Sequence, residues 1–258
     1  LILLNFFNRA IVDVLKDRDK HTISAYLSRI PRKERDNVGF VCIDMTDKYR
    51  DVIGLYLPNA IIVADSFHVM KHIVETLDSV RLRVLRRFDN DRKSDEYYLL
   101  KYQDSLLYKF HIDYNFKKNR HFRRFISEQQ MLDMMTSLDE QLYDSWIYYH
   151  QYHRFNDTEY TDLNQAYNDL MNIINDYRLS GIHEFISLAD TLYNWRFEII
   201  NSFSLFRDRR VSNGPIEGRN SLIKKVLRLA NGYSAFSRFR NRIIYSLNKF
   251  SKHSFPHE

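Results

Sequence analysis

Residues 38–65 read VGFVCIDMTDKYRDVIGLYLPNAIIVAD, and this stretch carries the clearest strand and helix signals of the chain. Its two ends, residues 38–43 and 60–64, are continuous apolar runs rich in β-branched side chains, which predict strands buried on both faces. Between them, residues 47–57 place apolar side chains at helical spacing, and Pro58 ends that helix. The order strand, helix, strand predicts a parallel pair joined by a right-handed crossover.

An aspartate follows each predicted strand, Asp44 after the first and Asp65 after the second. Ligands of open α/β sheets bind beyond the carboxyl ends of the strands. Neighbouring strands lie about 4.8 Å apart, so the two carboxyls are expected to share one rim of the sheet. A local role is the alternative for each, with Asp44 as a turn former and Asp65 as the cap of a helix that begins at Ser66.

The remaining pattern is mostly helical. Residues 66–88 place apolar side chains on one face at a period of 3.6, and residues 90–205 repeat apolar positions at intervals of three and four. Upstream, residues 10–15 predict a short strand and residues 22–30 a short helix. The chain therefore predicts a mixed α/β domain with a long helical segment.

The composition is that of an ordinary globular protein, with 258 residues, 44% hydrophobic and 28% charged. The single cysteine, Cys42, excludes an internal disulfide and a Cys-rich zinc site, and its place in a predicted strand indicates an inert core thiol. No apolar run approaches the roughly 20 residues of a membrane span, so we expect no membrane partner and a cytoplasmic location. Leu1 opens an apolar run without a start Met or a signal-peptide pattern, so we expect a fragment whose upstream part is missing.

Positive charge is concentrated near the end of the chain. Residues 207–249 hold eleven of the 39 Lys and Arg residues but only two of the 33 Asp and Glu residues. The net charge is +6, so the rest of the chain carries a small acidic excess. Such a segment attracts polyanions, nucleic acid above all, although a solvated basic face on an ordinary protein is the alternative.

Within that segment, a turn at residues 212–215 starts a helix that Asn231 and Gly232 end, and a last helix follows over residues 236–250. Helical spacing puts one carboxylate, an amide, a hydroxyl and two cations on one stripe, namely Glu217, Asn220, Ser221, Lys224 and Arg228. Apolar residues face the other way, namely Ile216, Ile223, Val226, Leu227 and Ala230. The stripe suits a metal-ligating carboxylate followed by phosphate-binding cations, whereas a capping-box Glu above a solvated face is the alternative.

A second metal pattern is weaker. His68, His72 and Glu75 recur at i, i+4 and i+7, but the segment lacks the Glu that follows the first His in metalloproteases. We therefore do not expect zinc here. The glycines are too sparse for a dinucleotide-binding or phosphate-binding loop.

Three separated blocks together resemble the DDE transposases of bacterial insertion sequences, specifically the ISL-three group. The blocks are VCIDMTDKYRD (41–51) with LPNAIIVADSFHV (57–69), VSNGPIEGRNSLIK (211–224), and NGYSAFSRFR (231–240). They occur in the family's order, and the resemblance spans residues 10 to 248. It implies one catalytic domain over residues 1–258, with a partial ribonuclease H-like sheet, a large all-helical insertion and C-terminal helices. The implied core covers residues 1–88 and 207–250, and the implied insertion covers residues 89–206.

The resemblance also implies a site. Asp44 and Glu217 match the second and third of three catalytic carboxylates and would bind Mg²⁺ or Mn²⁺, with two ions expected. Asp65 and His68 match an Asp-x-x-His motif. We expect them to contact the metal ligands without binding the metal themselves, or to have a structural role. The family's first Asp lies on a strand upstream of Leu1, and Asp13 falls on a later strand. The residues expected to contact DNA are Arg219, Asn220, Lys224, Lys225 and Arg228.

The implied activity is metal-dependent cleavage and transfer of DNA strands at the ends of an insertion sequence. The implied partner is double-stranded DNA, bound by a homo-oligomer in the nucleoid. We expect little or no cleavage by these 258 residues alone, because one acid is missing. Two alternatives stay open: a catalytically dead DNA-binding remnant, and a metal-dependent phosphohydrolase on a Rossmann-like sheet that uses Asp44 and Asp65.

Overall fold

The structure is a computed structural model of the chain. It describes residues 1–206, 209–211, 214–229 and 235–248, apart from the side chains of Phe206, Arg209, Pro215, Glu217 and Leu229. The predicted turn at 212–213 and the predicted helix stop at 231–232 lie outside the described residues.

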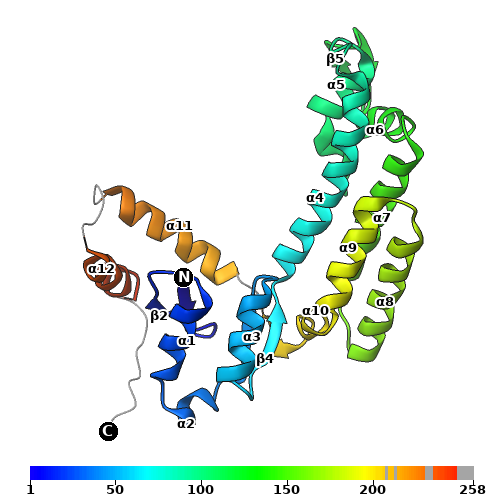
Figure 1. Cartoon of the computed structure of the whole chain (residues 1–258). Coiled ribbons are helices and arrows are strands. Elements are labelled where there is room, and N and C mark those ends of the chain that lie inside the picture. Colours follow the sequence, from blue (N-terminus) through cyan, green and yellow to red (C-terminus); the bar gives the residue numbers. More distant parts are fainter. Residues whose placement is uncertain (207–208, 212–213, 230–234, 249–258) are drawn as a thin grey trace. The chain divides into compact units, whose positions relative to one another are not determined.

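The fold is mixed α/β, mostly helical with small two-stranded sheets, which confirms the predicted class at that level. The chain forms two compact units (Figure 1). Unit 1 comprises Leu1–Phe67 and Asn201–Glu258, and unit 2 comprises His68–Ile200. None of the described helices is both long and apolar enough to cross a membrane.

Unit 1 contains most of the strands. They are β1 (Ile2–Leu4), β2 (Ile11–Val14), β3 (Phe40–Ile43), β4 (Ile61–Ala64), β7 (Leu205–Phe206) and β8 (Arg209–Arg210). Its helices are α1 (Lys20–Ser28), α2 (Arg32–Arg35), α3 (Asp47–Tyr56), α11 (Gly214–Leu229) and α12 (Phe236–Asn248). The predicted elements over residues 10–64 and the two C-terminal helices are confirmed.

The antiparallel hairpin β1–β2 packs against the helices of unit 1, and two apolar clusters form the contacts. The first cluster joins β2 to the C-terminal helices and consists of Ile11, Val14, Ile223 and Ile243. The second joins the hairpin end to α1 and α3 and consists of Leu15, Ile23, Leu27 and Val52. Ile223 and the adjacent Val226 are therefore on the core-facing side of α11, as the spacing predicts, whereas Leu227 is exposed.

Strands β3 and β4 form the predicted parallel pair, with Phe40 opposite Ile61 and Ile43 opposite Ala64. The prediction that both strands are fully buried is wrong, because only Ile43 of β3 is buried and Ile61 of β4 is exposed. The reason is topological: among the described strands β3 pairs with β4 alone, and its other side lines a cavity.

Unit 2 is built on the long helix α4 (Ser66–Leu85), whose first two residues belong to unit 1. The further elements are η1 (Arg86–Phe88), α5 (Asp95–Tyr102), η2 (Asp104–Tyr108), β5 (Lys117–Asn119), β6 (Arg124–Ile126), α6 (Glu128–Thr136), α7 (Glu140–Asp157), α8 (Leu163–Leu179), α9 (His183–Asn194) and α10 (Arg196–Asn201). Helix α8 packs on both α7 and α9. Arg83 of α4 donates to Glu184 of α9 at 2.9 Å and to Gln141 of α7 at 2.9 Å, which ties α4 to the same bundle.

The segment 89–206 is not all-helical, which corrects the prediction. Strands β5 and β6 form an antiparallel hairpin inside it, and β7 lies at its end. Only Ile126 among the strand residues of this hairpin is buried. Its sequence therefore lacks the alternation of apolar and polar residues by which a strand is predicted. Strand β1 was not predicted either, since a three-residue strand in a continuous apolar run has no boundary signal.

Candidate metal centre

The register of the parallel pair brings two carboxylates together. Ile43 lies opposite Ala64, and the N–H of Asp65 donates to the carbonyl of Ile43 at 3.0 Å. Asp44 and Asp65 are therefore the next residues in register, at the carboxyl end of β3 and of β4. The shared rim predicted from the sequence is thus formed.

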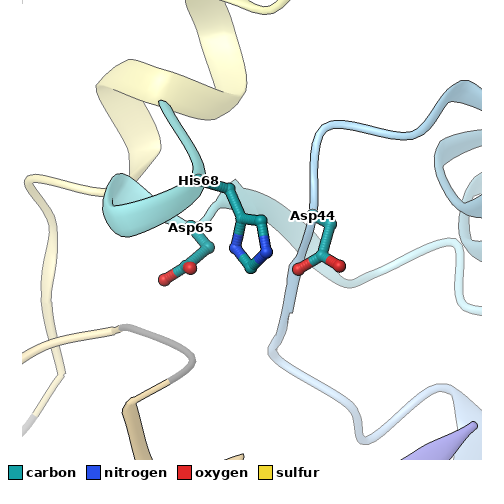
Figure 2. Close-up of side chains that lie close together, drawn as sticks. All are labelled: Asp44, Asp65 and His68. Carbon is teal, nitrogen blue, oxygen red and sulfur yellow. The ribbon is translucent and has the colours of Figure 1, made fainter. Parts of the chain in front are cut away.

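His68 joins the two aspartates because it lies in the first turn of α4, which begins directly after Asp65. One ligand atom from each of Asp44, Asp65 and His68 lies within 4.8 Å of the others. Figure 2 shows the imidazole of His68 between the two carboxylates. Asp65 is fully buried, while Asp44 and His68 are partly buried.

This donor set fits a divalent cation. Carboxylate oxygens are the ligands that Mg²⁺ and Mn²⁺ prefer, and an imidazole nitrogen adds affinity for transition metals. It is the only such group of three found among the described residues. The alternative pattern is not assembled, since His72 and Glu75 are exposed and Glu75 pairs with Lys71 at 3.6 Å.

The negative charges at the rim affect the pKa of the neighbouring Cys42 thiol. Burial raises the pKa of the Cys42 thiol, and the negative charges of Asp65 and Asp44 raise it further. The thiol is a free cysteine that stays protonated at neutral pH. Its side chain is partly buried, and the raised pKa makes it a poor nucleophile at neutral pH.

Asp44 also lines a cavity of about 850 Å³ within unit 1. The walls come from the β1–β2 hairpin, from β3 and from α11, which contributes Ile216 and Asn220. Helix α11 therefore faces the same open space as Asp44, although the two are far apart in the sequence. Glu217 lies between Ile216 and Asn220 in the sequence of α11, and its side chain is outside the described part of the structure.

The predicted DNA-contacting residues of α11 have different surroundings. Lys224, Lys225 and Arg228 are exposed. The guanidinium of Arg219 donates to the carbonyl of Arg9 at 2.8 and 3.1 Å and to that of Leu247 at 3.0 Å. Arg219 thus holds α11 to the hairpin turn and to α12, which leaves only its remaining N–H donors for a phosphate.

Asp13 is engaged elsewhere, in agreement with its exclusion from the predicted site. Its buried carboxylate accepts from Arg240 through both oxygens, at 2.5 and 2.8 Å. This bidentate pair joins β2 to α12, and it was not foreseen because nothing in the sequence couples positions 13 and 240. Asn248 of α12 makes a similar link by bonding both the N–H and the carbonyl of Ile11 at 2.9 Å.

Comparisons with known proteins place these features in a family. Residues 2–243 match the sequence model of the ISL3 family of DDE transposases, described as "Transposase". The transposase for insertion sequence element IS1001 of Bordetella parapertussis is 30% identical over 112 residues, which cover 41% of this chain and 28% of that protein. No solved structure matches the chain.

Proposed function

The chain belongs to the ISL3 family of DDE transposases, and from that premise we propose that it acts in metal-dependent cleavage and transfer of DNA strands at insertion-sequence ends. The observation that carries the proposal is the assembly of Asp44, Asp65 and His68 by the register of β3 and β4. Divalent metal use is general in such enzymes, and this rim offers a donor set for it.

We propose a partial ribonuclease H-like sheet as the framework of this site. In this proposal residues 1–88 and 207–250 form the catalytic core, and residues 89–206 form the insertion. The parallel pair β3–β4 with a carboxylate at each strand end supports it. The β1–β2 hairpin, packed against α11 and α12, would complete the core.

The proposed catalytic and metal-ligating residues are Asp44 and Glu217. Asn220 lines the cavity together with Asp44, and it follows Glu217 by three residues on α11. Residues three apart share a helix face, so Glu217 is expected to face that cavity as well. Asp65 and His68 would orient the cation and Asp44, and no described residue is proposed for the family's first aspartate.

A bound Mg²⁺ or Mn²⁺, two ions in this proposal, would activate a water or 3′-hydroxyl and stabilise the leaving oxygen. The chain's own residues supply the rest. Asp44 and Glu217 would supply anionic oxygens, and the buried carboxylate of Asp65 lies beside Asp44. Lys224, Lys225 and Arg228 would hold the DNA backbone along the exposed face of α11.

The proposed partner is double-stranded DNA, bound in the nucleoid by a homo-oligomer. Among the DNA contacts we include Asn220 through its amide and Arg219 through the donors it does not use within the fold. Neither alternative function is favoured. A phosphohydrolase would hydrolyse small phosphate esters irrespective of DNA, and a DNA-binding remnant would bind DNA without cleaving it.

A nicking assay tests the proposal. DNA that carries insertion-sequence ends is incubated with the chain, and in parallel with a form extended upstream, over a titration of Mg²⁺ and Mn²⁺. Nicking by the extended form should require the metal and should vanish in Glu217→Gln, while DNA affinity stays nearly unchanged. Equal loss of DNA binding in Glu217→Gln would make Glu217 a structural cap.

Three further measurements complete the test. Calorimetric titration of the chain with Mn²⁺ should show binding that Asp44→Asn removes, whatever the activity. Robust nicking by the chain alone would refute the expectation that one acid is missing. Hydrolysis of p-nitrophenyl phosphate without any effect of DNA would instead favour the phosphohydrolase.

A further inference from the structure

The β5–β6 hairpin of unit 2 presents one polar, outward face. Lys118 lies opposite Phe125 and Asn119 lies opposite Arg124 in the register. Ile126 is buried, and the amide of Asn119 donates to the hydroxyl of Tyr98 on α5 at 3.2 Å. Side chains alternate along a strand, so Lys118 and Phe125 point to the side of the hairpin opposite to Asn119 and Ile126.

This hairpin is strongly basic. Residues 114–127 contain five Lys and Arg residues and no acid. Lys117 pairs with Asp113 at 2.7 Å, whereas the other four have no ion-pair partner among the described residues, namely Lys118, Arg120, Arg123 and Arg124. Two acids on the neighbouring helices are already engaged, since Glu128 pairs with Lys109 and Asp95 with His121.

Large rings are exposed among these cations. Tyr114, Phe116 and Phe125 have exposed fractions of 71%, 61% and 65%. Exposed aromatic rings lower solubility, so a cationic face that serves only to keep the protein in solution is not expected to contain them. Rings interleaved with cations are instead typical of surfaces that bind unpaired nucleic-acid strands, where phosphates meet the cations and bases stack on the rings.

The turn of the hairpin holds a third feature. Arg123 has a φ of 53°, in the left-handed region that glycine adopts without strain. An arginine at this position keeps a cation at the tip against a backbone preference. Strained positions of this kind are concentrated at functional sites.

We propose that the β5–β6 hairpin is a second DNA-binding element, separate from α11. Its cations bind phosphates, and Phe125 stacks on a base in DNA that contains unpaired bases. Charge complementarity selects the partner, because four unpaired cations on one short hairpin suit a polyanion. The inference rests on the proposed function, which makes DNA the substrate.

Fluorescence anisotropy on the full chain tests this inference. Two labelled probes are used over a range of NaCl concentrations: a duplex, and the same duplex with a central stretch of unpaired bases. The variant Lys118→Ala/Arg120→Ala/Arg123→Gly removes three cations, and glycine at position 123 relieves the left-handed strain. The control variant Lys16→Ala/Arg29→Ala/Lys33→Ala removes three exposed cations from unit 1.

The hairpin variant should lower the slope of log Kd against log salt by roughly 2 to 3, because each phosphate contact contributes about 0.9. The control should leave the slope unchanged. Phe125→Ala should raise the Kd for the probe with unpaired bases roughly tenfold and leave the plain duplex nearly unaffected. Thermal melting should show both hairpin variants folded, since Phe125 is exposed and Arg123→Gly removes strain.

The outcomes separate the inference from the proposed function. Binding by the wild-type chain with equal slopes for the hairpin and control variants overturns the inference and leaves the function standing. An equal effect of Phe125→Ala on both probes overturns the stacking role. Absence of binding by the wild-type chain to either probe contradicts the DNA substrate itself.

Discussion

The two units of the molecule differ in the size of their buried side chains and in the acids that they contain. The twelve largest fully buried side chains among the described residues all belong to unit 2, from Ile73 to Phe185. In unit 1 the apolar contacts around the β1–β2 hairpin fall into small clusters on β2 and its helices. Unit 1 instead contains Asp44 and Asp65, whose carboxylates adjoin each other at the strand ends.

This difference shows where substitutions should affect stability and where they should affect activity. Burial of large apolar side chains is the main source of folding free energy, so unit 2 should be the more stable unit. Asp44 is a proposed metal ligand of unit 1, so its substitution should affect activity before stability. The four predictions below test this contrast.

The largest effect is expected for Asp44→Asn in unit 1. Metal-dependent nicking by a form of the enzyme that is active should fall at least ~100-fold, because a ligand to the cation is lost. The melting temperature should change little, because asparagine has nearly the same size and shape as aspartate. Asp51→Asn is the matched control, since Asp51 is an exposed acid of α3 that pairs with the exposed Lys20. A comparable loss of nicking in Asp51→Asn would erase the contrast.

Core truncation should affect unit 2 more than unit 1. Leu77→Ala removes a fully buried side chain of α4 and should lower the free energy of unfolding by about 3 kcal/mol. Val52→Ala in α3 should cost about 2 kcal/mol, because the side chain removed is smaller. Urea denaturation followed by circular dichroism measures both. Equal shifts would mean that the two cores contribute alike.

The buried ion pair of unit 1 should come next. Arg240→Ala leaves the Asp13 carboxylate, which is 7% exposed, without its bidentate partner. We expect a loss of about 2 kcal/mol in the free energy of unfolding, mostly from the uncompensated buried charge. Arg242→Ala on the same helix is exposed and should be nearly neutral. An Arg240→Ala protein as stable as the Arg242→Ala control would show that the pair is dispensable.

The smallest effect concerns the pH dependence of unit 2. Burial, followed by the charges of Arg154 and His153, lowers the pKa of His150 to about 4. The unfolded imidazole titrates near 6.5, so between these values the unfolded state binds a proton that the folded state does not. Stability should therefore fall by about 1 kcal/mol as the pH drops from 7 towards 5, after allowance for partial exposure.

His150→Phe should remove that fraction of the pH dependence, and His111→Phe, at an exposed position, should not. Urea midpoints at a series of pH values measure it. A pH profile of His150→Phe that overlays the wild type would place the titrating group elsewhere.

The parallel pair was predictable because its signals are local. Each of β3 and β4 is an apolar run with an aspartate behind it, and Pro58 marks the end of the helix between them. Parallel pairing then follows from the connection alone, and with it the meeting of Asp44 and Asp65.

Other features depend on contacts that a sequence does not display. The pairing of Asp13 with Arg240 joins residues 227 positions apart. The β5–β6 hairpin has one buried strand side chain and an arginine where the turn favours glycine, so both strand and turn signals are missing. The one signal in the sequence was the concentration of five cations within residues 114–127, which indicates a basic surface.

We propose that Asp44 and Glu217 share one cation pocket beside Asp65, and iron-mediated cleavage of the protein tests this most directly. Fe²⁺ replaces the natural cation, and hydroxyl radicals generated with ascorbate and peroxide cut the backbone close to the metal. The account predicts cuts beside Asp44, beside Asp65 and around Glu217, all suppressed by excess Mg²⁺ and absent from Asp44→Asn. Cuts confined to the two strand ends, with none in α11, would contradict it.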